Sequence, residues 1–371
     1  MSLFERIQSE LDALREKDQF RVLRDVNDDL LNLSSNDYLG LNAMPELREE
    51  FYKKLQDCPT DQTYALSSSS SRLLTGNHPG YPELEQTLSK MYNDRAALVF
   101  NSGYHANIGI LPALTTKKDL ILCDKLNHAS IIDGIRLADA DFKRYSHLDY
   151  KALENLLEKN SAKYENIFII SESIFSMDGD AADLCKLVEL KQKYKAILIV
   201  DEAHSVGVFG ETGCGLAEEQ GVLDEIDIIV GTFGKAFCSA GAYAIMDEVL
   251  RDYLINKMRS FIFTTALAPV VVNWSRFVLN KTIGMKKRRK HLFKISKKLR
   301  DGLKSIGDSQ IIPFVVGENA AAVALSEKLR EAGILAFPIR PPSVPAGTAR
   351  LRFSLSAALT EEDIDRILEV I

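Results

Sequence analysis

One lysine of this chain lies in a setting that could make it a nucleophile. Lys235 lies in the stretch GTFGKAF, between small residues and shortly after the apolar run DIIVG at 227–231. Most lysines are solvated surface groups, but burial disfavours the charged form of an amine and lowers its pKa. A neutral amine at this position could attack a carbonyl carbon and form a Schiff base.

An aspartate at the end of another apolar run suggests what that Schiff base would serve. Asp201 closes AILIVD and is followed by Glu-Ala-His204. A carboxylate there can keep a heteroaromatic nitrogen protonated, and pyridoxal phosphate (PLP) requires a Schiff-base lysine together with such an acid. His204 could reach the ring hydroxyl. Gly103 and Tyr104 follow the run AALVF and could offer backbone N–H groups to the phosphate at a helix start.

Two other kinds of site receive little support from the same residues. DEAH is also the acidic motif of helicase-type NTPases, but that class needs G-x-x-x-x-G-K-[ST] near its start. The only Gly-Lys pair here is followed by alanine and comes after DEAH, so both the chemistry and the order fail. We expect no metal site, because DEAH supplies no HExxH motif and the other histidines are dispersed.

The pattern of apolar runs predicts the elements that position these residues. Helical segments such as Asp149–Glu158 and Ala182–Lys193 separate short apolar runs. The runs lie at 97–100, 119–123, 166–171, 196–201 and 227–231. Nearly continuous apolar strands that alternate with helices indicate an α/β fold with a parallel sheet covered on both faces. Ligands of such sheets bind beyond the carboxyl ends of the strands, where these candidate residues lie.

The character of the chain changes near residue 280. A basic helix is predicted over 286–303, with apolar residues at Leu292, Ile295 and Leu299, and further helices at about 319–332 and at the C-terminus. We interpret its charges as a solvated helix face rather than a nucleic-acid site. The predicted organisation has three parts: an N-terminal arm (1–45), a large PLP-binding domain (46–280) and a small C-terminal α+β domain (281–371).

Composition bounds the class of protein. The 371 residues are 46% hydrophobic and 26% charged, with a net charge of -6, which argues against nucleic-acid binding through bulk positive charge. No run approaches about 18 apolar residues, and the amphipathic N-terminus lacks the apolar core of a signal peptide. Five scattered cysteines without a CxxC pair argue against a disulfide framework. We expect a cytoplasmic enzyme with a small-molecule substrate.

Several stretches together resemble the α-oxoamine synthases, which are fold-type I PLP-dependent transferases, and the resemblance extends over the whole chain. The stretches are NLSSNDYLGL, SRLLTGN, NHASIIDGIR, SESIFSMDGD, DEAHSVGVFG, GTFGKAF, FIFTTALAP and IRPPSVPAGTARLRFSL. The resemblance implies a mostly parallel central sheet in the large domain. Within the family, the chain is most similar to the branch that condenses L-alanine with a pimeloyl thioester, carried by coenzyme A or acyl carrier protein, in biotin biosynthesis. A sister enzyme that joins glycine to acetyl-CoA is the alternative.

The resemblance implies roles for the candidate catalytic and cofactor residues. Lys235 matches the Schiff-base lysine, Asp201 the partner of the pyridinium nitrogen, and His204 the contact to the ring oxygen. His128 matches a histidine that stacks on the cofactor and touches the substrate. Without the resemblance, a helix-capping role for His128 would be an equal alternative. The further cofactor-binding positions implied are Gly103, Tyr104, Ser176, Thr232, Thr264 and Thr265.

The resemblance also implies a subunit arrangement and a substrate site. The two threonines of FIFTTALAP match residues that reach the phosphate of the neighbouring subunit's cofactor, which implies a homodimer with shared active sites. Arg352 matches the arginine that grips the substrate carboxylate, for which a guanidinium fork is well shaped. Asn36 would assist it, and Arg21 and Ser343 match positions that contact the acyl substrate. We expect Arg350 to face solvent.

Three departures from the family pattern leave the assigned residues in place. SSSSSRL replaces a glycine-rich stretch, FCSAGAY follows the lysine where glycine is usually more frequent, and Leu359 replaces a frequent histidine. A non-catalytic homologue, the remaining alternative, would be expected to lack the lysine.

Overall fold

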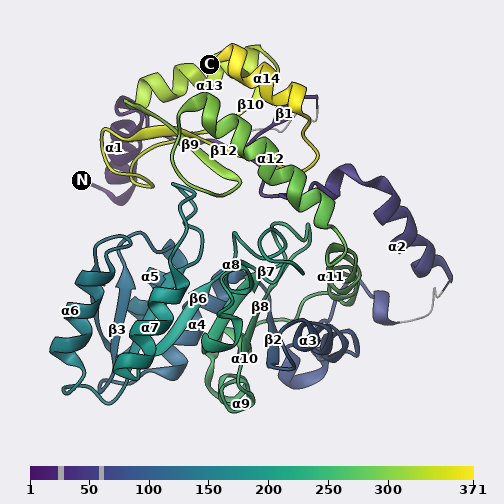
Figure 1. The fold of residues 1–371 in the computed structure, drawn as a ribbon, viewed down its shortest axis with the longest axis vertical. Coiled ribbons are helices and arrows are strands. Elements are labelled where there is room, and N and C mark those ends of the chain that lie inside the picture. The colour runs from purple at the N-terminus through teal and green to yellow at the C-terminus, as the bar shows by residue number, and fades with distance from the viewer. Residues whose placement is uncertain (24–28, 58–61) are drawn as a thin grey trace. The chain divides into compact units, whose positions relative to one another are not determined.

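The computed structural model describes residues 1–23, 29–57 and 62–371 (Figure 1). Cys58, one of the five cysteines, lies outside the described residues. The described chain contains no helix with both the length and the apolarity needed to cross a bilayer.

The chain divides into two compact units, each of which is described by itself. The large unit comprises Leu39–Phe175 and Ala181–Arg289. The small unit comprises Met1–Tyr38, Ser176–Asp180 and Lys290–Ile371. The N-terminal segment therefore clusters with the C-terminal one, as does the short segment that begins at Ser176.

A mostly parallel sheet with the strand order β2-β8-β7-β6-β5-β3-β4 forms the centre of the large unit. The five adjacent strands β7, β6, β5, β3 and β4 pair in parallel, whereas β8 is antiparallel to both of its neighbours, β2 and β7. Their bounds are β2 (Ala96–Phe100), β3 (Leu120–Asp124), β4 (Asp141–Tyr145), β5 (Ile167–Glu172), β6 (Ile197–Asp201), β7 (Ile228–Thr232) and β8 (Ala242–Met246). The α/β prediction is confirmed, and the five predicted runs match β2, β3, β5, β6 and β7.

Both faces of this sheet are buried. Ile121, Ile170 and Val230 on one face pack in a core that includes Ile110 of α4 and Ile135 of α5. The alternate residues Leu122, Ile169 and Leu198 are also fully buried. Because successive side chains of a strand point to opposite faces, burial of both sets requires apolar residues at nearly every position.

The helices of the large unit connect and cover these strands. Polar caps fix several helix starts: Ser102 Oγ accepts a hydrogen bond from the His105 N–H, and Asp149 and Asp183 cap two later helices in the same way. The α-helices are α2 (Pro45–Asp57), α3 (Gly80–Met91), α4 (Gly103–Leu114), α5 (Ala129–Leu137), α6 (Tyr150–Asn160), α7 (Leu184–Tyr194), α8 (Leu216–Glu219), α9 (Glu248–Lys257), α10 (Arg259–Ile262) and α11 (Pro269–Thr282). Shorter helical turns are η1 (Leu41–Ala43), η2 (Gln62–Tyr64), η3 (Arg72–Gly76) and η4 (Leu223–Glu225).

The small unit is built on short antiparallel strands and amphipathic helices. Its sheet has the order β11-β12-β9, and β1 pairs in parallel with β10. The strands are β1 (Leu31–Asn32), β9 (Ile311–Gly317), β10 (Ile334–Leu335), β11 (Pro338–Ile339) and β12 (Ala349–Ser354). The helices are α1 (Leu3–Glu16), α12 (Lys286–Leu303), which begins in the last residues of the large unit, α13 (Asn319–Glu331) and α14 (Glu361–Val370).

The basic helix α12 has the amphipathic character that its sequence predicts. Leu292, Ile295 and Leu299 are fully buried. Lys294 and Lys298 form ion pairs with acidic residues of α14. These two positive charges are therefore matched by acidic side chains of the same unit.

The prediction for Arg350 is wrong. Its side chain is 6% exposed and forms an ion pair with Asp178. The residue lies on β12, the central strand of the three-stranded sheet, so its guanidinium must be compensated within the protein. The compensating carboxylate comes from the 176–180 segment, far away in the sequence.

Helix α7 ends with a residue in a costly backbone conformation, which generates a stability prediction. Lys195 is exposed and adopts φ 53°, ψ 40° at the C-cap. A side chain in the left-handed region is disfavoured, whereas glycine adopts it freely. We expect Lys195→Gly to raise the free energy of unfolding by about 0.5–1 kcal/mol in urea denaturation. Lys195→Ala is the control, because it removes the same charge but keeps the Cβ. Equal stabilisation by both variants would contradict the conformational explanation.

Candidate active site

Three neighbouring strands of the large unit end at the same edge of the sheet and carry the central residues. Glu172 at the end of β5 lies in register with Asp201 at the end of β6. Strand β7 ends with Thr232, and the loop that follows carries Lys235 before the chain returns as β8. This loop is closed at its base, because the Phe233 N–H donates to the Gly241 carbonyl at 2.9 Å. Lys235 is thus held on a short hairpin loop.

A cavity of about 180 Å³ lies at this edge. It brings together many of the residues that the sequence singled out as catalytic or cofactor-binding: Gly103, Tyr104, His128, Asp201, His204, Thr232 and Lys235. These residues come from α4, the start of α5, the ends of β6 and β7, and the loops that follow those strands. The convergence agrees with the expectation that ligands bind beyond the carboxyl ends of parallel strands.

The cavity also contains residues that the sequence reasoning did not select. Asn107, Ser130, Glu172 and Ala203 complete the lining. Two signals could have identified candidates among them. Glu172 directly follows a predicted buried strand, and Asn107 is a lone amide in the apolar segment ANIGILPAL.

The candidate nucleophile touches a histidine. Lys235 Nζ lies 2.8 Å from His204 Nε2. His204 is buried, with 5% of its surface exposed. At that distance one nitrogen donates to the other, so the amine and the imidazole are hydrogen-bonded to each other inside the cavity.

The carboxylate of Asp201 is buried and hydrogen-bonded. Asp201 is 7% exposed. Its Oδ2 accepts a hydrogen bond from Asn107 Nδ2 at 2.7 Å, and its Oδ1 accepts one from the Ala203 N–H at 2.9 Å. Both carboxylate oxygens therefore have hydrogen-bond donors within the large unit.

His128 both caps a helix and lines the cavity, so the two readings of this residue are compatible. It is the N-cap of α5, where its Nδ1 accepts a hydrogen bond from the Ser130 N–H at 3.2 Å. The backbone N–H of His128 donates to Glu172 Oε1 at 2.5 Å. Burial, with a smaller contribution from the nearby Lys235 ammonium, lowers the pKa of His128, and Asp201 opposes this shift.

Two carboxyl groups beside Asp201 have shifted protonation equilibria. Burial raises the pKa of Glu172 well above its ordinary value, and the adjacent Asp201 charge acts in the same direction. Burial also raises the pKa of Glu202, which accepts hydrogen bonds from the N–H groups of Leu216 and Ala217. Both groups therefore hold a proton to higher pH than an exposed glutamate does.

The residues around the cavity fit PLP. A Cβ added at Gly103 would meet nothing within 4 Å, so the first turn of α4 opens onto free space where backbone N–H groups can receive a phosphate. Lys235 supplies the amine for a Schiff base, and Asp201 the carboxylate for a pyridinium nitrogen. All these groups belong to the large unit.

The predicted substrate-carboxylate residues lie together in the small unit, with Ser176. Arg352 Nη1 and Nη2 each lie 3.3 Å from Asn36 Oδ1, and Arg352 Nε donates to the Ser176 carbonyl. Ser176 was expected to bind the cofactor. In its own unit it holds the guanidinium of Arg352 through its backbone.

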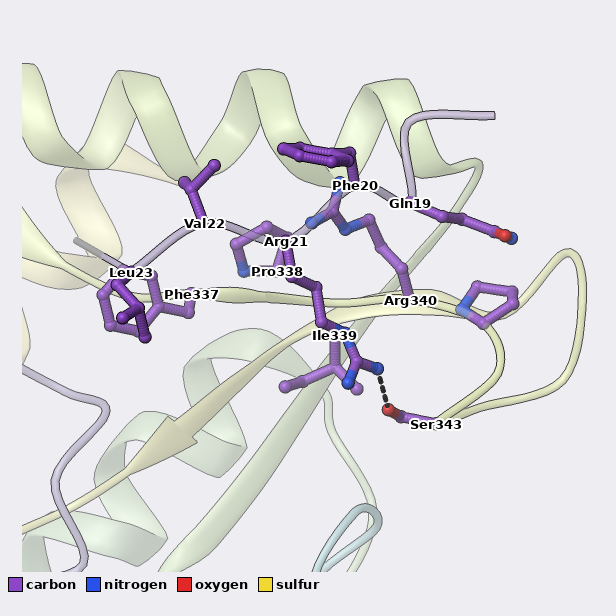
Figure 2. Close-up of a pocket in the computed structure, with 11 residues that line it drawn as sticks. Gln19, Phe20, Arg21, Val22, Leu23, Phe337, Pro338, Ile339, Arg340 and Ser343 are labelled. Atoms are coloured by element: carbon purple, nitrogen blue, oxygen red, sulfur yellow. Dashed lines mark hydrogen bonds between the residues drawn. The ribbon is translucent and has the colours of Figure 1, made fainter. Parts of the chain in front are cut away.

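A second cavity, of about 380 Å³, contains both predicted acyl-binding residues. Arg21 Nη2 donates to Ser343 Oγ at 3.0 Å, as Figure 2 shows. Leu23, Phe337 and Ile339 are among the apolar residues that line the same cavity. The sequence reasoning did not select the apolar residues of this lining, nor Arg340, whose guanidinium donates to the Asp18 carbonyl.

The two threonines assigned to a neighbouring subunit lie outside the lining of the cofactor cavity. Asn101 Nδ2 donates to the Thr265 carbonyl at 2.6 Å and to Thr264 Oγ1 at 3.3 Å. The serine run that departs from the family pattern supports this segment, because the Ala266 N–H donates to the Ser70 carbonyl at 2.9 Å. Ser68 Oγ also donates to the Leu267 carbonyl at 2.5 Å, so the serine run contacts this segment through both backbone and side-chain groups.

The sequence of this chain matches the model of a known protein family. Residues 28–371 match the family model "Aminotransferase class I and II", and the chain belongs to that family.

Individual relatives narrow the class. The chain is 51% identical over 383 residues to an 8-amino-7-oxononanoate synthase of Chlorobaculum parvum, which covers 99% of this chain and 98% of that protein. It superposes on the serine palmitoyltransferase of Sphingomonas wittichii with a TM-score of 0.89 at 32% identity, covering 100% and 96% of the two chains. A structure of SPT with PLP matches with a TM-score of 0.90 at 28% identity, covering 100% and 97%. The predictions of an α-oxoamine synthase, of the fold-type I architecture and of PLP as cofactor are confirmed.

The raised pKa of Glu172 predicts a pH-dependent contribution to stability. Above its ordinary value of 4.5, the unfolded chain loses a proton that the folded protein keeps, so stability falls as pH rises toward the folded pKa. Glu172→Gln removes this titration and preserves an acceptor for the His128 N–H. We expect its free energy of unfolding, measured in urea from about pH 5 to pH 8, to decline less steeply than that of the unaltered protein.

The control for this series is Glu165→Gln, which changes an exposed carboxylate paired with Lys118. It should keep the slope of the unaltered protein. Identical slopes for all three proteins would show that Glu172 does not titrate differently in the folded and unfolded states.

Proposed function

We propose that this chain catalyses the decarboxylating condensation of L-alanine with a pimeloyl thioester, with PLP as cofactor, in biotin biosynthesis. The products are 8-amino-7-oxononanoate, carbon dioxide and the free thiol. The convergence of Lys235, His204, Asp201 and His128 on one cavity carries the proposal. The 51% identity to an 8-amino-7-oxononanoate synthase supports the choice of substrates.

The residues of the large unit would divide the chemistry among them. When bound, PLP supplies an electron sink for the pair of electrons that a departing proton or carboxylate leaves on the substrate Cα. Lys235 would hold the cofactor covalently and, once displaced by the substrate amine, carry the Cα proton. Asp201 would keep the pyridine nitrogen protonated, and His204 would contact the ring oxygen. His128 would donate a hydrogen bond to the oxyanion that develops when the thioester is attacked.

The residues of the small unit would recognise the two substrates. Arg352 presents a guanidinium oriented by Asn36 and the Ser176 carbonyl, which suits the planar carboxylate of alanine. The second cavity, with Arg21 and Ser343 at its polar end and apolar side chains along its wall, suits a methylene chain that ends in a carboxylate (Figure 2). The predicted division into an arm (1–45), a cofactor domain (46–280) and a small domain (281–371) belongs to the same proposal.

We further propose a homodimer with shared active sites in the cytoplasm. Thr265 is exposed, Thr264 is half-buried, and the described lining of the cofactor cavity includes neither. Such a placement suits residues that serve the cofactor of a neighbouring copy. The acyl donor is a coenzyme A thioester or an acyl carrier protein thioester, and a side-by-side assay of the two distinguishes them.

Product analysis tests the proposed reaction. Purified protein with PLP, L-alanine and pimeloyl-CoA should release 8-amino-7-oxononanoate, detected by mass spectrometry, whereas glycine with acetyl-CoA should give little product. Lys235→Ala should lose the visible absorption band of the bound cofactor and lower the rate by roughly 1,000-fold or more, because the covalent anchor and the proton carrier are both removed. Lys118→Ala, an exposed lysine on the same unit, is the control. A Lys235→Ala protein with full activity, or preferred use of glycine with acetyl-CoA, would refute the assignment.

The acyl cavity generates a second prediction. Arg21→Ala should raise the KM for pimeloyl-CoA by roughly 10-fold or more and leave the KM for alanine within about threefold, since only one substrate loses a charged hydrogen bond. Arg6→Ala, which removes an exposed arginine of α1, should change neither constant. Equal effects of Arg21→Ala on both substrates would argue against a separate acyl site.

A further inference from the structure

We propose that Asn107 is a positioning residue that fixes the proton of His128 on Nε2, so that the imidazole acts as a neutral hydrogen-bond donor. The assignment of the proton depends only on contacts within the large unit. The target of the donor, an oxyanion on the acyl group, rests on the proposed function.

The orientation of the Asn107 amide follows from its partners. Asn107 is 4% exposed, and its Nδ2 lies 2.7 Å from Asp201 Oδ2 and 3.0 Å from Ser130 Oγ. An ionised carboxylate only accepts hydrogen bonds, so the amide nitrogen must face Asp201. Both amide hydrogens are then used, one toward Asp201 and one toward Ser130.

The direction of the next hydrogen bonds is determined in turn. Ser130 Oγ accepts from Asn107, so its own hydrogen is available for His128 Nδ1, 2.7 Å away. The Ser130 N–H also donates to His128 Nδ1, at 3.2 Å. A nitrogen that receives two donors carries no proton itself. The neutral imidazole therefore has its hydrogen on Nε2.

The surroundings of His128 also favour the neutral ring. Donors at Nδ1 stabilise the unprotonated nitrogen, and burial lowers the pKa of the imidazole. Carboxyl groups and an ammonium face the ring from the neighbouring elements. They are Asp201 at the end of β6, Lys235 after β7 and Asp133 on α5. Glu172, at the end of β5, accepts from the backbone N–H of His128. Lys235 opposes a second positive charge in the same cavity.

This chain of contacts gives His128 and Lys235 different roles. His128 with a protonated Nε2 cannot act as a general base from that nitrogen, and it can donate without transferring a full charge. Proton removal from the substrate then remains with Lys235. Asn107 acts on the acyl oxyanion only through Ser130 and His128 in this scheme, and its other amide hydrogen is donated to Asp201.

The tautomer can be observed directly. The protein with bound PLP is labelled with ¹⁵N-histidine, and the ring signals of His128 are identified by their loss in His128→Gln. We expect proton-coupled Nε2 and a Nδ1 shift of the unprotonated type at about pH 7. A proton on Nδ1, or protonation of both nitrogens at this pH, would overturn the inference.

A matched pair of variants tests the role of Asn107. Asn107→Leu removes both amide donors, which lets Ser130 Oγ turn and accept from a protonated Nδ1. We expect the pKa of His128, read from its ¹⁵N shifts, and the acid limb of kcat to rise by about one pH unit. The value of kcat should fall roughly tenfold, while the KM for alanine stays within about threefold.

The control is Asn273→Leu. Asn273 is buried to the same 4% exposure, and its amide donates to the backbone carbonyls of Thr63 and Pro269. This variant should lose stability without moving the His128 signals or the acid limb. Equal shifts in both variants, or none in Asn107→Leu, would contradict the positioning role. If Asn107→Leu does not fold, the tautomer of the unaltered protein still decides the inference.

The outcomes separate this inference from the proposed function. A protein that shows the expected His128 signals but does not condense alanine with pimeloyl-CoA would retain the inference and lose the proposed function. A protein that catalyses the condensation with His128 protonated on Nδ1 would retain the proposed function and contradict the inference about Asn107.

Discussion

A carboxylate buried at the end of a strand must be surrounded by hydrogen-bond donors, and Asp201 imposes this requirement on the large unit. Its two oxygens are satisfied by the Ala203 N–H and by Asn107, which lies on α4. The helix that supplies Asn107 also presents its first turn to the cavity, beginning at Gly103. The placement of the acid, the amide and the helix start that lines the cavity is therefore one structural arrangement rather than three.

Two buried glutamates lie beside Asp201 and retain their protons to higher pH than exposed glutamates do. Burial raises the pKa of both Glu172 and Glu202, and each is used as an acceptor for backbone N–H groups. Environments that separate the pKa values of neighbouring acids are a recurrent way to give them different roles. Here Glu172 and Glu202 accept hydrogen bonds from the backbone N–H groups of His128, Leu216 and Ala217, which ties the loops beside Asp201 to these two buried side chains.

Sequence patterns predicted the central strands well because both faces of the sheet are buried, which forces continuous apolar runs such as AILIVD. They missed β4, an edge strand with the sequence DFKRY and mostly exposed residues. They also missed β8, whose apolar run AYAIM follows the lysine loop closely and pairs in the antiparallel direction.

The site residues that the sequence did not predict were missed for a similar physical reason. Strand ends indicated Asp201 and Lys235, whereas the proposed roles of most other residues depended on family resemblance. Arg350 was assigned to solvent because nothing local reveals its partner Asp178, which only folding brings near. Ser130 was missed for the same reason, whereas Asn107 could have been noticed as a lone amide in an apolar segment, although its partners Asp201 and Ser130 could not.

The closed base of the loop between β7 and β8 has a consequence for changes of sequence within the loop. Lys235 is positioned by the strands on either side and by the Phe233–Gly241 backbone hydrogen bond. Residues 237–239, which depart from the family's glycine-rich pattern, lie within this loop and also receive bonds from outside it, since Trp274 Nε1 donates to the Cys238 carbonyl at 2.9 Å. Within the loop, the Cys238 N–H donates to the Lys235 carbonyl and the Ser239 N–H to the Phe233 carbonyl, both at 2.9 Å. These contacts are made by backbone groups, which a change of side chain at 237–239 leaves in place.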